Sequence, residues 1–301
     1  MTPPVAPFGR VLTAMVTPFT AEGALDLDGA QALARHLVDQ GNDGLVISGT
    51  TGESPATSDR EKTDLLHAVV GAVGDRCTVL AGVGTSDTAH SVELARAAAS
   101  AGAAGLLLVT PYYNKPPQAG VVAHCRAVAD TTELPVMLYD IPGRSGIPMT
   151  TETLVTLAAH PRIVAVKDAK LDLEATSWVL KRTELAYYCG HDPWTLPLLS
   201  IGAAGVVGTS THVTAGGTRE LIDAFLTGDL ARARKLHEQL LPAYSGIFRT
   251  QGTILVKAAL RELGLPAGPV RLPLVDATAD EVAQLRADLA DAGIDLGLGS
   301  A

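Results

Sequence analysis

The chain has 301 residues, of which 47% are hydrophobic, and its formal net charge is −9 at pH 7. This length and apolar content can bury a sizeable core in one large domain, or in one domain with an appendage. The acidic balance and the lack of basic runs argue against a nucleic-acid-binding protein. No apolar run approaches about 18 residues, so the sequence predicts no membrane-spanning helix.

The N-terminal residues and the cysteines bear on the cellular compartment. Residues 1–7 have neither the basic nor the apolar region of a secretory signal. Cys77, Cys125 and Cys189 are widely spaced and show no metal-ligand spacing. An odd number of dispersed cysteines is typical of a reducing compartment. We therefore expect a cytoplasmic protein without a metal site.

Eight short apolar segments alternate with segments of helical periodicity. The apolar segments have the composition of buried parallel strands and lie at residues 11–16, 44–48, 78–83, 106–110, 135–140, 163–167, 186–190 and 206–209. The helical segments between them lie at residues 28–40, 59–73, 88–100, 118–130, 151–159, 173–181 and 193–201. Eight βα units in this order predict a parallel (β/α)8 barrel of about 250 residues, an α/β fold of the TIM-barrel type.

A G-x-x-G pattern marks three of the helix-to-strand junctions. It occurs at Gly41-Asn42-Asp43-Gly44, Gly102-Ala103-Ala104-Gly105 and Gly202-Ala203-Ala204-Gly205. Its first glycine can end a helix in the left-handed conformation, so the pattern indicates αβ linkage and not phosphate binding. A doubly wound open sheet is the alternative fold. That fold usually has a glycine-rich turn after its first strand, which the sequence Thr17-Pro18-Phe19-Thr20 does not provide.

The pattern of strands stops after Gly228. Residues 229–241, 252–263 and 278–292 have helical patterns, and Thr278 followed by Asp280 and Glu281 is typical of a helix start. We therefore expect a barrel at residues 1–228 that carries the active site, and a C-terminal helical region at residues 229–301 built from three helices.

The sixth apolar segment ends in a lysine and indicates Schiff-base chemistry. Its sequence is Ile163-Val164-Ala165-Val166-Lys167-Asp168. An ammonium group at a buried strand end loses water, which disfavours its charged form and lowers its pKa. Such a lysine can attack a carbonyl group and form an imine. The alternative is a lysine that extends to the surface or pairs with Asp168.

Polar side chains follow several predicted strands, and the C-terminal strand ends of a barrel form its active site. Hydroxyl groups dominate there, which suits imine chemistry because its steps move protons; they belong to Thr50, Thr51, Tyr113 and Tyr139. The guanidinium of Arg144 suits a substrate carboxylate. Each residue also has an ordinary alternative, as a turn threonine, a packed tyrosine or a solvated loop arginine.

Four motifs in chain order resemble those of a known enzyme family. They are Gly49-Thr50-Thr51-Gly52-Glu53, Pro111-Tyr112-Tyr113-Asn114-Lys115-Pro116, Leu138-Tyr139-Asp140-Ile141-Pro142-Gly143-Arg144-Ser145-Gly146 and Val166-Lys167-Asp168-Ala169. Together they resemble the dihydrodipicolinate synthase (4-hydroxy-tetrahydrodipicolinate synthase) family of pyruvate-dependent class I aldolases, over about residues 11–273.

The resemblance implies four catalytic residues. Lys167 would form the imine with pyruvate, and Tyr139 would donate and accept protons beside it. Thr50 and Tyr113 would complete a proton relay, with Tyr113 contributed by a neighbouring subunit. No metal or organic cofactor is implied, because pyruvate would be bound covalently on Lys167.

The resemblance also implies four substrate-binding residues. Thr51 would hold the pyruvate carboxylate, and Arg144 would bind the carboxylate of L-aspartate 4-semialdehyde. Val207 stands where the family usually has an isoleucine whose backbone faces pyruvate. Gly190 is the fourth implied substrate-binding residue.

Two segments depart from the family pattern on the side of the second substrate. Cys189-Gly190-His191-Asp192 replaces Ser-Gly-Asp-Asp, and Val207-Gly208-Thr209 replaces Ile-Ser-Val. These departures leave the identity of the aldehyde open. Ser86 and His90 replace the asparagine and glutamate expected in lysine-inhibited members, so we expect no regulation by lysine.

The predicted function is a lyase that condenses pyruvate with L-aspartate 4-semialdehyde to 4-hydroxy-tetrahydrodipicolinate, toward diaminopimelate and lysine. The resemblance also implies a homotetramer, assembled as a dimer of dimers. One alternative is an N-acetylneuraminate-lyase-like or 2-keto-3-deoxy-sugar aldolase, and another is a barrel that binds a keto acid without turnover.

Overall fold

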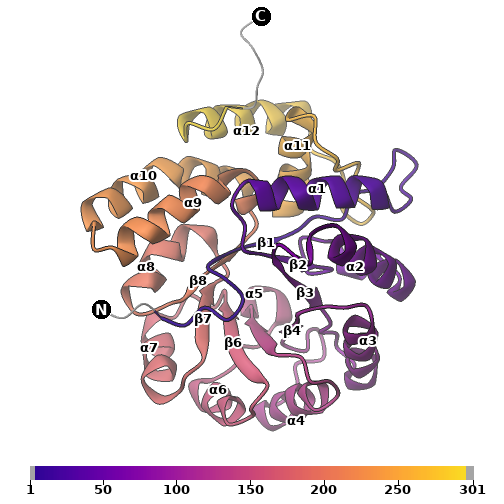
Figure 1. The fold of residues 1–301 in the computed structure, drawn as a ribbon, viewed down its shortest axis with the longest axis vertical. Helices are drawn as coiled ribbons and strands as arrows, with labels where there is room; N and C mark the ends of the chain where they lie inside the picture. Colours follow the sequence, from indigo (N-terminus) through magenta and orange to yellow (C-terminus); the bar gives the residue numbers. More distant parts are fainter. Residues whose placement is uncertain (1–3, 296–301) are drawn as a thin grey trace, which may run out of the picture.

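The computed structural model describes residues 4–295, and its centre is a closed barrel of parallel strands (Figure 1). The strands follow one another around the barrel in chain order, and pairing of β1 with β8 closes it. They are β1 (Val11–Ala14), β2 (Gly44–Ile47), β3 (Thr78–Gly82), β4 (Gly105–Val109), β5 (Val136–Asp140), β6 (Ile163–Asp168), β7 (Ala186–Cys189) and β8 (Gly205–Gly208). The predicted (β/α)8 barrel is confirmed, and the closed sheet excludes the open-sheet alternative.

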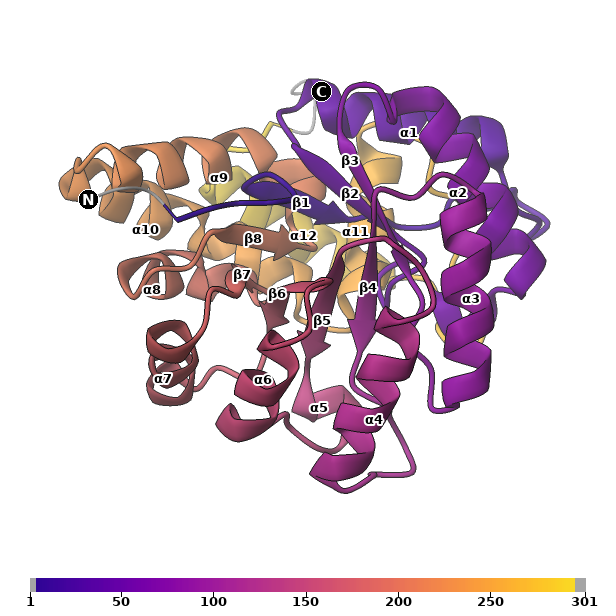
Figure 2. The ribbon, with the colours of Figure 1, turned by 60° about the horizontal axis from the view of Figure 1, so that its bottom comes forward.

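Helices form a ring around the strands (Figure 2). They are α1 (Leu27–Asp39), α2 (Asp59–Val73), α3 (Thr88–Ser100), α4 (Gln118–Ala129), α6 (Thr151–Ala158), α7 (Leu173–Arg182), α8 (Thr195–Ser200) and α9 (Thr211–Leu226). Three short helical turns lie in the loops at the C-terminal strand ends: η1 (Ser54–Ala56), α5 (Pro142–Ser145) and η2 (Asp192–Trp194).

Local sequence explains where these helices begin and end. The Ser58 hydroxyl accepts the Glu61 N–H while the Glu61 carboxylate accepts the Ser58 N–H, so this capping box fixes the start of α2. At the other end, Gly41, Gly102 and Gly202 follow α1, α3 and α8 with φ of 97°, 87° and 107°. Only glycine adopts this conformation without steric cost, so the G-x-x-G pattern links helices to strands, as predicted.

The elements differ from the predicted ones in three places. Helix α9 has no counterpart among the predicted helices, because its threonines and the pair Gly216-Gly217 weaken the helical signal. The predicted helix at residues 193–201 is split into η2 and α8. Helix α10 (Leu230–Ile247) continues through Pro242, where a helix end at residue 241 was expected. A proline removes one backbone hydrogen bond from a helix interior but does not always end the helix.

The C-terminal region consists of α10, α11 (Gly252–Glu262) and α12 (Ala279–Asp291). Helix α10 packs against α9 of the barrel, and α12 packs against α10 and α11, so the three helices cover one side of the ring (Figure 1). The division at residue 228 stays a prediction. Within residues 4–295, no helix has the length and apolar character needed to cross a membrane.

The strands separate two apolar layers of the core. One layer fills the barrel and includes Leu12, Val46, Leu80 and Met137, and the other lies between the strands and the surrounding helices. Successive strand residues point to opposite faces. Tyr139 of β5 is in register with Lys167 of β6, and the next residues, Asp140 and Asp168, are also in register. The first pair therefore points into the barrel, and the second points out toward the helices.

Candidate active site

Lys167 lies at the inner face of the barrel mouth, beside Tyr139. Its Nζ is 4.3 Å from the centre of the Tyr139 ring, and its side chain is almost completely buried. Burial lowers the pKa of Lys167 to about 8, and the nearby positive charge of Arg144 acts in the same direction, while Asp192 opposes the shift. A larger fraction of this amine is therefore neutral near neutral pH than for an exposed lysine. The neutral amine is the form that attacks a carbonyl carbon.

Tyr139 of β5 is a register partner of Lys167, and its ring faces the amine. Burial raises the pKa of Tyr139, and the Arg144 charge and a hydrogen bond with the Thr50 side chain oppose that shift. The phenol therefore keeps its proton near neutral pH, which is the state required of a proton donor. Arg144, at the end of α5, is close enough to act electrostatically on both Tyr139 and Lys167.

Gly190 provides the space in which Lys167 lies. A Cβ atom at this position would lie 3.0 Å from Cγ and 3.1 Å from Cε of Lys167. Both distances are shorter than ordinary van der Waals contacts, so any larger residue at position 190 would displace the lysine side chain. The glycine thus acts on the site through its lack of a side chain.

The loop between β2 and η1 carries Thr50 and Thr51 in an unusual backbone conformation. Ser48 and Glu53, which flank the loop, have φ of 57° and 54° and therefore adopt the left-handed region without being glycines. Such residues cost free energy and persist where surrounding contacts fix them. The Thr17 hydroxyl donates to the Gly52 carbonyl at 2.6 Å, which is one of these contacts.

Thr51 meets the end of strand β8 across the barrel mouth. Its Oγ1 is 3.1 Å from Oγ1 of Thr209, and both side chains are buried. Asp192 accepts from the Ser210 backbone N–H at 3.0 Å, and the ring Nδ1 of His212 lies 2.7 Å from the Thr209 carbonyl oxygen. Burial lowers the pKa of His212 to about 4, so the ring is neutral and its Nδ1–H donates to that carbonyl. Asp192 and His212 thus fix the backbone of residues 209 and 210 through hydrogen bonds.

These side chains surround a cavity of about 190 Å³. Its walls come from the ends of β5 and β6, from the loops after five strands, and from the end of α10 and the start of α11. The lining residues are Thr50, Thr51, Tyr139, Ile141, Arg144, Lys167, Ala169, Gly190, His191, Thr209, Phe248, Gln251, Gly252 and Thr253. The polar groups gather around the Lys167 amine, so a small carbonyl compound with a carboxylate would find both a nucleophile and hydrogen-bond donors here.

A second cavity of about 230 Å³ adjoins the first across Thr50, Tyr139 and Arg144. It is mainly apolar, and its lining includes Leu107, Val109 and the ring of Tyr112.

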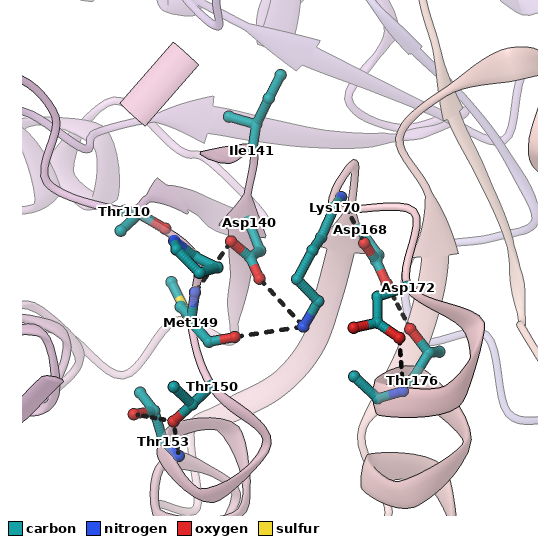
Figure 3. Close-up of polar contacts among 12 residues, drawn as sticks. Thr110, Asp140, Ile141, Met149, Thr150, Thr153, Asp168, Lys170, Asp172 and Thr176 are labelled. Carbon is teal, nitrogen blue, oxygen red and sulfur yellow. Dashed lines mark hydrogen bonds and ion pairs between the residues drawn. The ribbon is translucent and has the colours of Figure 1, made fainter. Parts of the chain in front are cut away.

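The outward face of the same strand ends carries a separate polar network (Figure 3). Asp168 accepts from the Thr176 hydroxyl at 2.6 Å and from the Lys170 N–H at 2.7 Å. Asp140 accepts from the Met149 N–H at 3.1 Å, and its Oδ2 is 3.6 Å from Lys170 Nζ. Lys170 therefore lies outside the barrel and does not share the cavity of Lys167.

The comparison with known families decides the relationship of the chain. The profile of the dihydrodipicolinate synthetase family matches residues 7–292. The chain belongs to this family. The resemblance in the sequence motifs is thereby confirmed.

Individual relatives agree with this assignment. The 4-hydroxy-tetrahydrodipicolinate synthase of Acidothermus cellulolyticus is 69% identical over 288 residues, covering 96% of this chain and 94% of the relative. The 4-hydroxy-tetrahydrodipicolinate synthase 2 of Streptomyces coelicolor is 62% identical over 293 residues, covering 97% and 98%. The crystal structure of the DHDPS from Cyanidioschyzon merolae with lysine bound has a TM-score of 0.94 and 42% identity, and covers 96% of this chain and 99% of that one.

Most of the residues that the family resemblance selected line the cavity that contains Lys167. Thr50, Thr51, Tyr139, Arg144, Lys167 and Gly190 all line it. Tyr113 does not line this cavity, because its side chain is 91% exposed in the loop after β4, with φ of 72°. Val207 is buried within β8 among the apolar side chains inside the barrel and is also not part of the lining.

The C-terminal region contributes residues to the cavity that no sequence pattern predicts. Phe248, Gln251 and Thr253 belong to the turn between α10 and α11 and to the first turn of α11. They follow no barrel strand, so the rule that sites form at strand ends could not select them. The one local signal is Gln251, whose side chain accepts the Thr253 N–H and starts α11.

Proposed function

We propose that this chain condenses pyruvate with L-aspartate 4-semialdehyde to 4-hydroxy-tetrahydrodipicolinate, through an imine between pyruvate and Lys167. The observation that carries the proposal is the buried Lys167 amine with its lowered pKa, beside Tyr139, in a chain of this family. The reaction makes the chain a lyase of diaminopimelate and lysine biosynthesis. The lysine supplies the covalent chemistry, and no cofactor forms part of the proposal.

The chemistry follows from the arrangement at the barrel mouth. The neutral Lys167 amine attacks the ketone carbon of pyruvate, and loss of one water molecule gives the imine. Loss of a proton from the methyl carbon gives an enamine, which adds to the aldehyde carbon. The amine of the second substrate then displaces Lys167 and closes the ring, so the net reaction releases one water molecule.

Tyr139 and Thr50 are proposed to move the protons in these steps. The phenol keeps its proton because burial raises the pKa of Tyr139, and the Thr50 side chain hydrogen-bonds to it. Thr51, held by Thr209 at 3.1 Å, is proposed to bind the pyruvate carboxylate. Val207 of β8 is proposed to face pyruvate with its backbone.

Tyr113 is proposed to act in the site of a neighbouring subunit. Its exposure in this chain supports the proposal, because a 91% exposed tyrosine is available for contact with another chain. The active species would then be at least a dimer, and a homotetramer of two dimers is the assembly we propose. A cytoplasmic location also remains a proposal, supported by the free thiols of Cys77, Cys125 and Cys189.

Arg144 is proposed to select the second substrate by its carboxylate. It lines the same cavity as Lys167, and Thr51 is proposed to serve the carboxylate of pyruvate, which leaves the guanidinium for the aldehyde. Replacement of Arg144 by alanine should lower kcat/KM for aspartate semialdehyde by roughly 10²-fold, about 2.7 kcal/mol. Formation of the pyruvate imine should be nearly unaffected.

The test is steady-state turnover with pyruvate and a panel of aldehydes, measured for wild type, Arg144→Ala and Arg162→Ala. Arg162 is the matched control, because it pairs with Glu133 at 2.6 Å on the surface and is not part of the cavity. We expect preference for aspartate semialdehyde and a loss confined to Arg144→Ala. Preference for a sugar-like or uncharged aldehyde would instead assign specificity to His191 and Thr209 and refute the proposed second substrate.

A further inference from the structure

A buried ion pair joins the Thr50–Thr51 loop to the C-terminal region. Nζ of Lys257, in α11, lies 2.7 Å from Oε1 of Glu53, and the two side chains are 0% and 1% exposed. Glu53 directly follows Thr50, Thr51 and Gly52 in the chain, and its φ of 54° places it in the left-handed region. The pair therefore lies at the end of the loop that carries two proposed substrate-handling residues.

Each side chain of the pair also contacts a second group. Lys257 donates to the Pro269 carbonyl at 2.8 Å, and its Nζ lies 4.2 Å from the centre of the Phe19 ring. The second carboxylate oxygen of Glu53 accepts from the Arg271 backbone N–H at 2.8 Å. These contacts fix both side chains in single positions, and they involve the barrel, α11 and the segment that follows α11.

A second contact, one helical turn away, joins the same two segments. The Thr253 hydroxyl donates to the Thr51 carbonyl at 3.2 Å. Thr253 and Lys257 are four residues apart in α11 and so lie on one face of the helix. The same face thus holds Thr51 by its carbonyl and Glu53 by its carboxylate, so the backbone between them is tied to α11 at both ends.

Stability alone is a poor explanation for this arrangement. Taking two charges out of water carries a large desolvation penalty, and apolar residues of similar volume often stabilise a protein as well or better. Desolvation lowers the pKa of Lys257, and its contact with Glu53 opposes that shift. What a buried ion pair provides and an apolar contact does not is a short approach between two particular groups, here 2.7 Å.

We propose that Glu53 and Lys257 are positioning residues of the reaction. Their ion pair, together with the Thr253 hydrogen bond, holds the loop so that Thr51 faces the pyruvate carboxylate and Thr50 faces Tyr139. The inference rests on the proposed function, because it concerns the residues that would handle pyruvate. It assigns to the C-terminal helix α11 a part in the first half-reaction, in which pyruvate binds and becomes an imine.

The test is the double substitution Glu53→Gln with Lys257→Met, which removes both charges and keeps the approximate volume. We expect KM for pyruvate to rise by roughly tenfold and kcat to fall by a similar factor, since small displacements of a binding group are costly. The KM for the aldehyde, whose proposed ligand Arg144 lies on another loop, should change by less than about twofold. All values are normalised to folded enzyme by circular dichroism.

Asp43→Asn is the matched control. Asp43 pairs with Arg219 at 2.6 Å and lies just before β2, at the opposite end of the barrel from the cavity. The Asp43→Asn substitution should lower the thermal midpoint and leave the KM values for pyruvate and for the aldehyde unchanged. The same result for the double variant, with lower stability and unchanged KM for pyruvate, would overturn the positioning role.

Two further variants keep the test decisive if the double variant does not fold. Glu53→Gln alone keeps the shape of the side chain, and Thr253→Val removes only the hydroxyl that contacts Thr51. Each should raise KM for pyruvate in the same direction, and unchanged values in both would reject the inference. The wild type is first tested for borohydride trapping of pyruvate, because failure there would refute the proposed function and not the positioning role.

Discussion

Lys167 and Lys257 are both buried and both follow a valine in the chain, but within residues 4–295 only Lys257 has a carboxylate beside its amine. Lys257 has a carboxylate oxygen of Glu53 at 2.7 Å, whereas Lys167 has the face of Tyr139 at 4.3 Å and no ion-pair partner within 4.0 Å in the part of the chain that the structure describes. Burial lowers the pKa of both. For Lys257 the nearby carboxylate opposes that shift at hydrogen-bond distance.

We infer that this difference separates the proposed nucleophile, Lys167, from an amine that is held as an ammonium group, Lys257. An ammonium group beside a buried carboxylate is kept protonated, because losing the proton would leave the carboxylate unpaired. For an amine without such a partner, desolvation outweighs the more distant charges, and the amine becomes neutral at a lower pH. Burial therefore does not by itself identify a nucleophile, and the absence of a close counter-ion is the second requirement.

The most severe way to break this comparison is to replace Lys167 itself. Lys167→Met should abolish borohydride-dependent addition of pyruvate and reduce turnover by roughly 10³-fold or more, because the covalent route is lost. In the wild-type protein, mass spectrometry of peptides should find one reduced pyruvyl group, on Lys167. Lys257 and Lys170 are the internal controls, and labelling at either of them would refute the assignment.

Sequence alone could select Lys167 as a candidate nucleophile, but it could not pair Lys257 with Glu53. Lys167 ends an apolar, β-branched segment, and such local patterns also allowed the eight strands to be predicted. Lys257 occupies a helix, and its partner Glu53 lies far away in the chain. Pairs of this kind depend on how α11 packs on the barrel, which no local periodicity records. The same limit applies to Phe248 and Gln251, whereas Arg144 was predicted because its guanidinium suits a carboxylate and because it belongs to one of the four family motifs.

The next largest effect should come from the phenol beside Lys167. Tyr139→Phe keeps the ring that contacts Nζ and removes only the hydroxyl, so packing around the amine is preserved. Turnover should fall by roughly 10²-fold or more, within the range for a lost general acid–base group. The KM for pyruvate should change much less. Turnover close to that of wild type in steady-state assays would limit Tyr139 to a packing role.

The pH dependence of imine formation sharpens the comparison without any substitution. Because the pKa of Lys167 is lowered to about 8, the neutral fraction should rise about tenfold per pH unit below that value and level off above it. The rate of single-turnover pyruvate trapping at saturating pyruvate should follow the same curve. A midpoint near 10.5, the ordinary value for lysine, would mean that the amine is solvated in the functional enzyme.

The smallest expected effect concerns Asp140, the ion-pair partner of a third lysine, Lys170. Burial disfavours the charged form of the Asp140 carboxyl. Asp140 lies on the outward face, and its Oδ2 is 3.6 Å from Lys170 Nζ (Figure 3). Burial raises the pKa of Asp140 to about 6, with Lys170 opposing the shift, from an ordinary value of 3.8. Asp168 and Tyr187 are the other titratable groups near this carboxyl.

The sign of the stability change follows from that shift. A carboxyl whose pKa is raised on folding stabilises the folded state below pH 3.8, and this contribution is lost as the pH rises through about 6. Asp140→Asn cannot titrate and can still accept the Met149 N–H, so its thermal midpoint should lose less than that of wild type between pH 4 and pH 7. The difference should be a few degrees and at most about 3 kcal/mol, the free energy that corresponds to the net pKa shift with Lys170 in place. Identical pH profiles for the two proteins would show that the Asp140 carboxyl titrates normally in the folded protein.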